Sequence, residues 1–274
     1  MDNLIRNYQN GYYNCTYENT TLTTNKIYEA HCHNSFEAIF VLSGNVDIII
    51  ENTEFNISKP CIVLIPPLKY HSVYTSKSSK YERIIVTFPQ SAIPVEISKQ
   101  VRDLNNGSLI LRDSETVELS NKLKKNIIAC DTDIYGPLII SYMTEVFYKF
   151  YENKDVIAEV IENGSENKLI SAIIEYVNSH INEKIALDDI ASAVFSSKST
   201  ICHVFKGKFQ TSIKQYILQK KIALAEEMIS KGCSAMTASQ AVGYTNYANF
   251  FSVYKKTTGK KPSDVLPLNS QTPR

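Results

Sequence analysis

The residues best suited to chemistry in the first part of this 274-residue chain are three histidines and a glutamate. His31, His33 and Glu37 follow one another closely, and on a strand the alternation of side chains places all three on one face. His71 comes 34 residues after Glu37. Three imidazoles and a carboxylate that converge inside a barrel suit Fe, Mn, Ni or Zn. The same side chains can instead line a pocket and form hydrogen bonds without a metal.

A second set of candidate residues lies in a basic C-terminal segment. Residues 166–274 contain 14 Lys and Arg against 8 Asp and Glu, which is a net charge of +6. Residues 1–165 contain 15 against 20, which is −5, and the two segments together give the +1 of the whole chain. A basic segment joined to an acidic one indicates that one part of the protein meets a polyanion such as DNA.

The elements that must position these residues change character along the chain. Short apolar runs separated by turn-forming residues predict an antiparallel barrel or sandwich, and they lie at 37–42, 46–50, 53–57, 61–65 and 81–88. From about residue 115 the apolar spacing is helical and predicts two helices, the second of them after Gly136-Pro137. The polar stretch 161–165 marks a break, after which the pattern is typical of short helices.

These short helices form two pairs, each joined by a tight turn. Ala191 permits close approach of the first two helices and Ser197 is a natural N-cap, while Gly243 and Asn246 supply the turn residue and the N-cap of the second pair. Such a pair is a helix-turn-helix unit, whose second helix enters the DNA major groove. The base-facing candidates are Lys198, Ser199, Thr200, Cys202, His203, Tyr247, Ala248, Asn249 and Ser252. The candidates for phosphate contact are Ser197, Lys206, Asn246, Lys255 and Lys256.

The second unit contains a run in which Gly, aromatic residues, Lys-Lys, Gly and Pro stand at fixed offsets. The run reads Ala241-Val242-Gly243-Tyr244-x-Asn246-x-x-Asn249-Phe250-Phe251-x-Val253-Tyr254-Lys255-Lys256-x-x-Gly259-x-x-Pro262. It resembles the signature of AraC/XylS-type transcription regulators, and residues 187–229 resemble the first helix-turn-helix of that family together with its joining helix. The resemblance implies two recognition helices on one rigid linker, which read successive major grooves on one face of double-stranded DNA. It also implies RNA polymerase as a partner.

The chain departs from the family pattern at several positions. Gln210 stands where the family usually has Gly, and Lys221 replaces the usual Arg of the joining helix. His203 and Ser252 stand where many members carry an Arg near the DNA. No Arg lies between residues 113 and 273, so this segment lacks the commonest reader of guanine. Because the Asn249 amide can pair with adenine, we expect an A·T-leaning site.

The histidine-rich segment has a resemblance of its own. The motifs that carry it are His31-x-His33-x-x-x-Glu37-(x)6-Gly44 and Pro66-x-Leu68-x-x-His71. They are similar to the two motifs of the cupin superfamily, although Leu68 stands where the second motif has Gly and Thr75 where it often has Asn. Sensor cupins attached to AraC-type domains often keep such residues without a metal. We therefore expect no cofactor and an effector pocket at His31, His33, Glu37 and His71, with a transition metal at these four residues as the alternative.

Together these patterns predict an α+β chain of two domains. A cupin-like antiparallel β-barrel at 1–110 is followed by a helical segment at 111–162, a linker at 163–167 and an all-α domain at 168–274. The all-α domain holds helix-turn-helix units at 187–208 and 236–257. The helical segment resembles the dimerising segment of AraC-type regulators, so a homodimer is expected, and a packed monomeric cap is the alternative.

The predicted function is regulation of transcription by sequence-specific DNA binding, with activation expected and no enzymatic activity. The barrel would sense a small-molecule or protein effector and bias DNA binding. The competing interpretation is a metal-dependent cupin enzyme of the oxygenase or isomerase type with an attached DNA-binding domain.

Composition limits where such a protein works. Apolar residues make up 43% and charged residues 21% of the chain, which is ordinary for a folded protein. The sequence has no apolar run long enough for a membrane span, and its polar start lacks the core of a secretory signal. The 6 cysteines form no CxxC pair. We therefore expect free thiols, no membrane partner and a cytoplasmic protein that meets the nucleoid through DNA.

Overall fold

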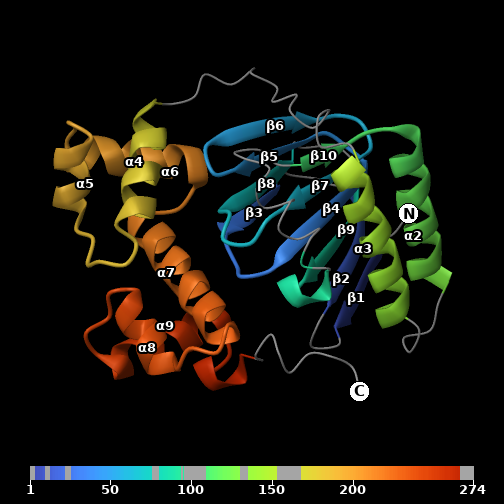
Figure 1. The fold of residues 1–274 in the computed structure, drawn as a ribbon. Coiled ribbons are helices and arrows are strands. Elements are labelled where there is room, and N and C mark those ends of the chain that lie inside the picture. Colours follow the sequence, from blue (N-terminus) through green and yellow to red (C-terminus); the bar gives the residue numbers. More distant parts are fainter. Residues whose placement is uncertain are drawn as a thin grey trace. The chain divides into compact units, whose positions relative to one another are not determined.

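The computed structural model describes residues 4–9, 13–21, 26–75, 80–93, 95, 109–129, 135–152 and 168–265. The predicted linker at 163–167 lies outside these residues. The chain forms two compact units, residues 1–28 with 35–164 and residues 29–34 with 165–274 (Figure 1). No helix within the described residues is both long and apolar enough to cross a membrane.

The first unit, together with residues 29–31, forms two β-sheets within the described part of the chain. Its strands are β1 (Leu4–Gln9), β2 (Asn14–Thr21), β3 (Lys26–His31), β4 (Phe36–Ser43), β5 (Val46–Ile50), β6 (Thr53–Ile57), β7 (Cys61–Ile65), β8 (His71–Thr75), β9 (Lys80–Phe88) and β10 (Leu109–Leu111). One sheet has the order β1-β2-β9-β4-β7-β10 and the other the order β3-β8-β5-β6. A short 3-10 helix, η1 (Gln90–Ala92), follows β9.

Alternation along the strands separates two apolar cores. On β4, Ile39 and Val41 belong to a core that also contains residues of β5, β6 and β8 from the second sheet, so this core lies between the sheets. Phe36 and Phe40 point to the opposite face, where their core contains residues of two helices. Because side chains alternate along a strand, Glu37 shares the inner face with Ile39.

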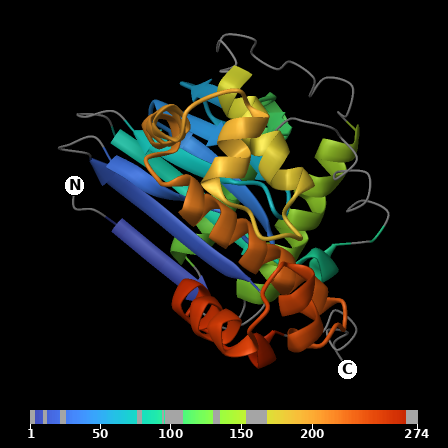
Figure 2. The same cartoon turned by 90° about the vertical axis from the view of Figure 1, so that its left-hand side faces the viewer.

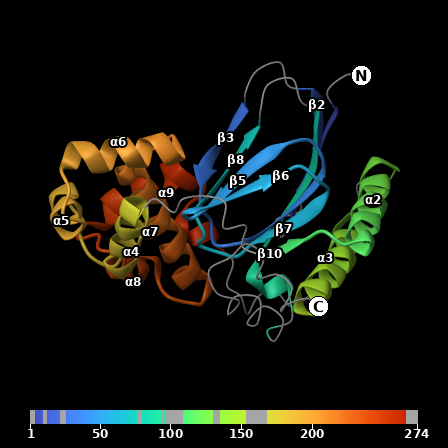
Figure 3. The same cartoon turned by 90° about the horizontal axis from the view of Figure 1, so that it is seen from above.

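Helices α2 (Ser114–Ala129) and α3 (Tyr135–Glu152) cover the outer face of the six-stranded sheet (Figure 3). Phe147 of α3 packs edge-on against Phe36 and Phe88 of the sheet. A polar contact also holds α2, because Lys124 forms an ion pair with Glu82 of β9. Glu82 in turn accepts a hydrogen bond from the Tyr17 hydroxyl at 2.7 Å.

The second unit is helical. Its elements are α4 (Lys168–Ser179), α5 (Leu187–Ala193), α6 (Lys198–Phe209), α7 (Ile213–Ser230), α8 (Ala235–Ala241), α9 (Tyr247–Thr258) and η3 (Pro262–Asp264). Helix α4 packs against α5 and α6, and α8 packs against α7 and α9. Figure 2 shows α7 as the helix that connects the α4–α6 group with the α8–α9 group.

Most of the predicted elements are confirmed. The predicted apolar runs correspond to β4, β5, β6, β7 and β9, and the predicted helices to α2–α9. Five strands were not predicted: β1, β2, β3, β8 and β10. Strand β2 has the sequence NCTYENTT. Its many polar residues are typical of a loop, so the sequence did not indicate a strand there. Its register with β9 nevertheless buries Glu18 and Thr20.

Candidate functional site

The first helix-turn-helix unit consists of α5 and α6. The Ser197 side chain accepts a hydrogen bond from the Thr200 backbone N–H at 3.1 Å and so caps α6, as its sequence position predicts. Phe195 in the preceding turn is left-handed, with φ 52, and its side chain is 97% exposed. Helix α6 ends at Gln210, which is also left-handed, with φ 54. The backbone therefore keeps the conformation that Gly would favour here, although the residue is Gln.

The second unit repeats this plan with α8 and α9. Asn246 caps α9 by accepting a hydrogen bond from the Asn249 N–H at 3.1 Å, as expected from the sequence. Gly243 takes the position that corresponds to Phe195, with φ 81. The backbone N–H of Phe195 bonds to Ser192 and that of Gly243 to Gln240, three residues earlier in both cases. The two units are thus closely similar in their turns.

Most of the predicted DNA-contacting residues lie on exposed surface. The apolar residues Ile201 and Phe205 of α6 and Phe250 and Tyr254 of α9 are buried. Cys202 is only half-buried, because it lies beside the packed face of α6. The exposed residues are Ser197, Lys198, Ser199, Thr200, His203, Lys206, Asn246, Tyr247, Ala248, Asn249, Ser252, Lys255 and Lys256. Both recognition helices therefore expose most of their predicted base-facing residues, with lysines further along each helix.

A buried lysine joins the two helix-turn-helix units. The Lys221 ammonium on α7 donates to the carbonyl oxygens of Ile181, Glu183 and Val242 at 2.7, 2.6 and 2.5 Å. Burial lowers the pKa of Lys221 to about 8, and the charge of Glu183 opposes this shift. At neutral pH the amine is thus mostly an ammonium, whose three N–H groups match three acceptors. The sequence pointed to this position only as a Lys in place of the usual Arg.

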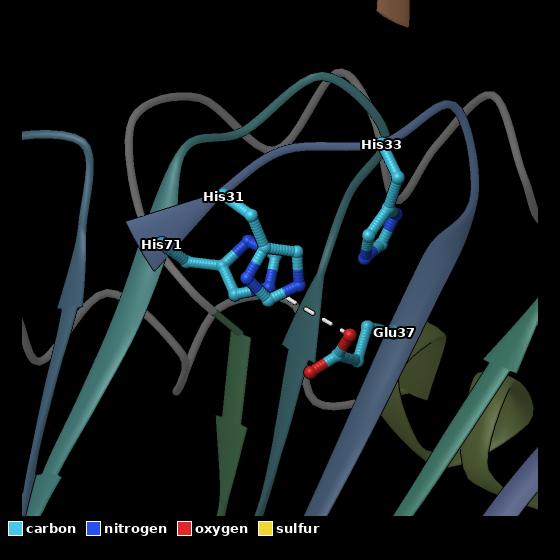
Figure 4. A group of neighbouring side chains, drawn as sticks. All are labelled: His31, His33, Glu37 and His71. Atoms are coloured by element: carbon cyan, nitrogen blue, oxygen red, sulfur yellow. Dashed lines mark ion pairs between the residues drawn. The ribbon is translucent and has the colours of Figure 1, made fainter. Parts of the chain in front are cut away.

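The four predicted pocket residues come together. The ligand atoms of His31, His33, Glu37 and His71 all lie within 4.8 Å of one another (Figure 4). His71 Nε2 lies 3.7 Å from Glu37 Oε2, and both residues are buried. His31 Nδ1 contacts the Glu29 carbonyl and His71 Nδ1 the Lys69 carbonyl, each at 2.9 Å, which orients both rings.

Electrostatics favour the charged form of His71. Burial alone would lower its pKa, but the charge of Glu37 at 3.7 Å raises it, and the Lys69 carbonyl and the Glu51 charge add to this effect. The net result is a raised pKa. A protonated His71 and the Glu37 carboxylate would therefore stabilise each other.

The prediction that His31, His33 and Glu37 lie on one face of a single strand is wrong. His31 is the last residue of β3, Glu37 is the second residue of β4, and His33 lies in the loop between them. Alternation along a single strand therefore cannot bring them together. The loop turns the chain back, and the pairing of β3 with β8 places His31 near His71.

The departure at Leu68 has a structural counterpart. Leu68 is left-handed, with φ 65, so the turn before His71 keeps a backbone conformation that favours Gly. Thr75, where the cupin motif often has Asn, is buried at the end of β8. As a donor set, the three imidazoles and one carboxylate suit a transition metal.

Comparison with known proteins matches both parts of the chain. An AraC-like ligand binding domain matches residues 20–123, and a helix-turn-helix domain matches residues 190–266. The HTH-type transcriptional regulator YdiP of Escherichia coli is 31% identical over 97 residues, which are 35% of this chain and 32% of YdiP. The chain thus spans about a third of that relative's length.

Two further proteins are similar over most of the chain. The HTH-type transcriptional regulator YobQ of Bacillus subtilis is 20% identical over 241 residues, which are 88% of this chain and 89% of YobQ. A crystal structure of apo ToxT from Vibrio cholerae has a TM-score of 0.45 and 12% identity, and covers 97% of this chain and 100% of ToxT. With a ligand-binding part and a helix-turn-helix part matched in this order, the chain belongs to the AraC/XylS family of transcription regulators.

Proposed function

We propose that this protein regulates transcription by sequence-specific binding to double-stranded DNA, and that its first unit senses an effector. The observation that carries the proposal is the pair of matched helix-turn-helix units, whose exposed recognition helices are joined by α7 and by the Lys221 contacts. The DNA-binding units would exist in more than one relative arrangement. An effector that binds one arrangement more tightly than the others would raise its population and so change the affinity for DNA. The protein acts by binding and carries out no turnover.

Selection of bound fragments from random DNA tests this proposal, with and without a deproteinised cell extract as the source of effector. Enrichment of one sequence motif is the expected result, and the extract should change its affinity. Affinity should also fall steeply with salt, because phosphate neutralisation releases counterions. Failure to enrich any motif, together with a flat salt response, would contradict DNA as the partner.

Within the DNA complex we assign different roles to the exposed residues. The predicted base-facing residues of α6 and α9, from Lys198 and Tyr247 onward, face bases, whereas Lys206, Lys255 and Lys256 contact phosphates. Ser197 and Asn246 use a side-chain oxygen as a helix cap, so any phosphate contact there comes from their remaining donors. His203 and Ser252 are short, so specificity depends on other side chains and on DNA shape.

Substitution of Asn249 and Lys255 separates base from phosphate contact. We expect Asn249→Ala to relax preference at one or two base pairs and to cost about 1–3 kcal/mol on the selected site, with little effect on random DNA. Lys255→Ala should weaken binding to both DNAs and reduce the salt slope by about one. Competition against single-base variants of the selected site measures both effects. An equal loss for every sequence in Asn249→Ala would remove Asn249 as a base reader.

The same proposal includes a homodimer, an activating contact with RNA polymerase and a cytoplasmic location. Exposed apolar side chains on α3 support the dimer, because Ile140, Tyr148 and Tyr151 are 40%, 52% and 37% exposed and follow one another at helical spacing. Light scattering on the purified chain measures the oligomeric state. A monomer at all concentrations would instead favour a packed helical cap.

A second candidate function is supported by the convergence of four ligand-type side chains. His31, His33, Glu37 and His71 would hold the metal, which would supply Lewis-acid or redox chemistry when bound. A metal-dependent cupin enzyme predicts one metal per chain and a loss of turnover in Glu37→Ala. DNA binding that is indifferent to metal removal favours the regulator.

We expect protein purified without chelator to carry well under one transition-metal ion per chain, since Leu68 and Thr75 replace residues of the second cupin motif. His31→Ala should leave the fold intact, because His31 is exposed at the end of β3. Elemental analysis and circular dichroism of both proteins provide the measurements. One full equivalent of metal that disappears in His31→Ala would overturn the metal-free pocket.

A further inference from the structure

A buried ion pair lies between the two sheets of the first unit, away from the four residues described above. Glu18 of β2 and Arg83 of β9 are directly paired across the strands, and they are 4% and 5% exposed. Arg83 donates to Glu18 Oε2 from Nε at 3.1 Å and from Nη2 at 2.8 Å. Arg83 also pairs in register with Val41, a residue of the inner core. The ion pair therefore faces the space between the sheets.

Two tyrosines fix the orientation of this pair. The centre of the Arg83 guanidinium lies 3.7 Å from the ring centroid of Tyr28 and 5.2 Å from that of Tyr81. The Tyr28 hydroxyl donates to Glu18 Oε1 at 3.0 Å. Both Glu18 oxygens therefore already accept hydrogen bonds, and the guanidinium packs on the Tyr28 ring, with the Tyr81 ring edge-on to that of Tyr28.

The next row of the same two strands adds two hydroxyl groups. Thr20 pairs with Tyr81, and these residues are 6% and 0% exposed. Within the described part of the chain, neither the Thr20 hydroxyl nor the Tyr81 hydroxyl has an acceptor for its own proton. Burial raises the pKa of Tyr81 more than the charge of Arg83 and its side-chain hydrogen bond to the phenol oxygen lower it, so the phenol keeps its proton. Two buried donors thus adjoin the guanidinium.

Folding alone does not account for this arrangement. A buried ion pair contributes little beyond what apolar residues of the same size would, and each unpaired buried hydroxyl destabilises the fold. Val in place of Thr20 and Phe in place of Tyr81 would fill the same space without that cost. Buried polar groups that lower the stability of the fold are typical of binding sites.

We propose that this group of residues binds an uncharged oxygen acceptor of a small molecule, such as an amide carbonyl. The group is called the Arg83 cluster and consists of Glu18, Thr20, Tyr28, Tyr81 and Arg83. This inference rests on the proposed sensing function and names the chemistry of its ligand. The unused groups are hydroxyls that can donate, whereas both Glu18 oxygens already accept hydrogen bonds, so the cluster takes an acceptor. A carboxylate would be repelled by Glu18, which already neutralises Arg83.

The Arg83 cluster is distinct from the histidine cluster. Glu37 and Val41 are four residues apart on β4, and Val41 is the residue paired with Arg83. At about 3.3 Å per residue these positions are about 13 Å apart. Ile39 lies between them on the same face. Substitutions in the two clusters can therefore be interpreted separately.

The first measurement is the melting temperature of the full chain without any added ligand. Thr20→Val and Tyr81→Phe should leave it unchanged or raise it by about 1–4 °C, because they remove unpaired buried hydroxyls. A clear decrease in both variants would contradict the proposal, since it would mean that the hydroxyls serve the fold, for example by holding a buried water.

The second measurement adds defined probes to the same proteins. The probes are straight-chain primary amides from acetamide to octanamide and the carboxylates of equal length, which differ from them in charge. We expect at least one amide to raise the melting temperature of the unsubstituted protein by about 2–5 °C, and its carboxylate to raise it less. Thr20→Val and Tyr81→Phe should lose this response. Thr144→Val, the same substitution at an exposed position of α3, should keep it.

Three results would overturn the proposal: no shift with any amide, an equal shift with the carboxylate, or a shift that persists in both variants. None of these measurements involves DNA. Failure of the Arg83 cluster as a ligand site is therefore distinguishable from failure of the regulator function, which the DNA selection tests.

Discussion

Replacement of Lys221 by Met should destabilise the helical unit by about 3 kcal/mol. Methionine is apolar and of similar length, so it fills the space but donates no hydrogen bond. The carbonyl oxygens of Ile181, Glu183 and Val242 then lose their shared donor, and the contact at Val242 is buried. Each buried acceptor left without a partner costs about 1–3 kcal/mol, although residual water lowers the total. Urea unfolding followed by far-ultraviolet circular dichroism measures the loss.

Lys214→Met provides the matched control. Lys214 lies on the same helix, α7, but its side chain is exposed, so the same substitution there should change stability by less than about 0.5 kcal/mol. Equal effects in the two variants would mean that the three contacts of Lys221 contribute nothing specific. Lys221→Arg is informative as well, because a planar guanidinium cannot copy the three-way geometry of an ammonium.

Lys221 also has a functional consequence for DNA binding. Ile181 and Glu183 precede α5, whereas Val242 ends α8, so one side chain ties the start of the first helix-turn-helix unit to the turn of the second. Two recognition helices held on one body can contact DNA together, with less loss of freedom than two independent units. Lys221→Met should therefore weaken binding to a two-part site more than binding to either part alone.

The sequence predicted best what is local in the chain. The caps at Ser197 and Asn246 follow from side-chain types within a few residues of one another, and both are confirmed. Left-handed positions were visible where Gly occurs, as at Gly243. At Phe195 the left-handed conformation was not visible, because nothing in a Phe marks a positive φ, and at Leu68 only the Gly of the cupin motif indicated it.

Long-range contacts were predicted less well. Glu18 and Arg83 are 65 residues apart, and their pairing depends on the register of β2 with β9, which a polar strand does not reveal. The four pocket residues were identified from a motif, while their convergence depends on a loop and on the pairing of β3 with β8. The motif thus identified the four residues that lie together, whereas the strand pairing and the loop of the fold explain how they are brought together.

Substitution of Gly243 by Ala should have an effect as large as that of Lys221→Met, for two separable reasons. The backbone at Gly243 has φ 81, a conformation that costs about 1 kcal/mol or more for any residue with a Cβ. The added Cβ would also lie 2.9 Å from the carbonyl carbon and oxygen of Glu183 and 3.1 Å from Lys221 Nζ. Because two of these atoms belong to the backbone, they cannot move away cheaply, so we expect a total loss of about 3 kcal/mol.

Gly259→Ala separates the two contributions. Gly259 is left-handed as well, with φ 72, but a Cβ built there meets nothing within 4 Å. Its substitution should therefore cost only the backbone strain, about 1 kcal/mol, and the difference between the two variants measures the clash at Glu183. In the double variant Gly243→Ala with Lys221→Met the losses should be less than additive, because Gly243→Ala already displaces the Glu183 carbonyl that Lys221 binds. Additive losses in urea unfolding would show that the turn and the lysine act independently, and would remove Lys221 as the link between the two helix-turn-helix units.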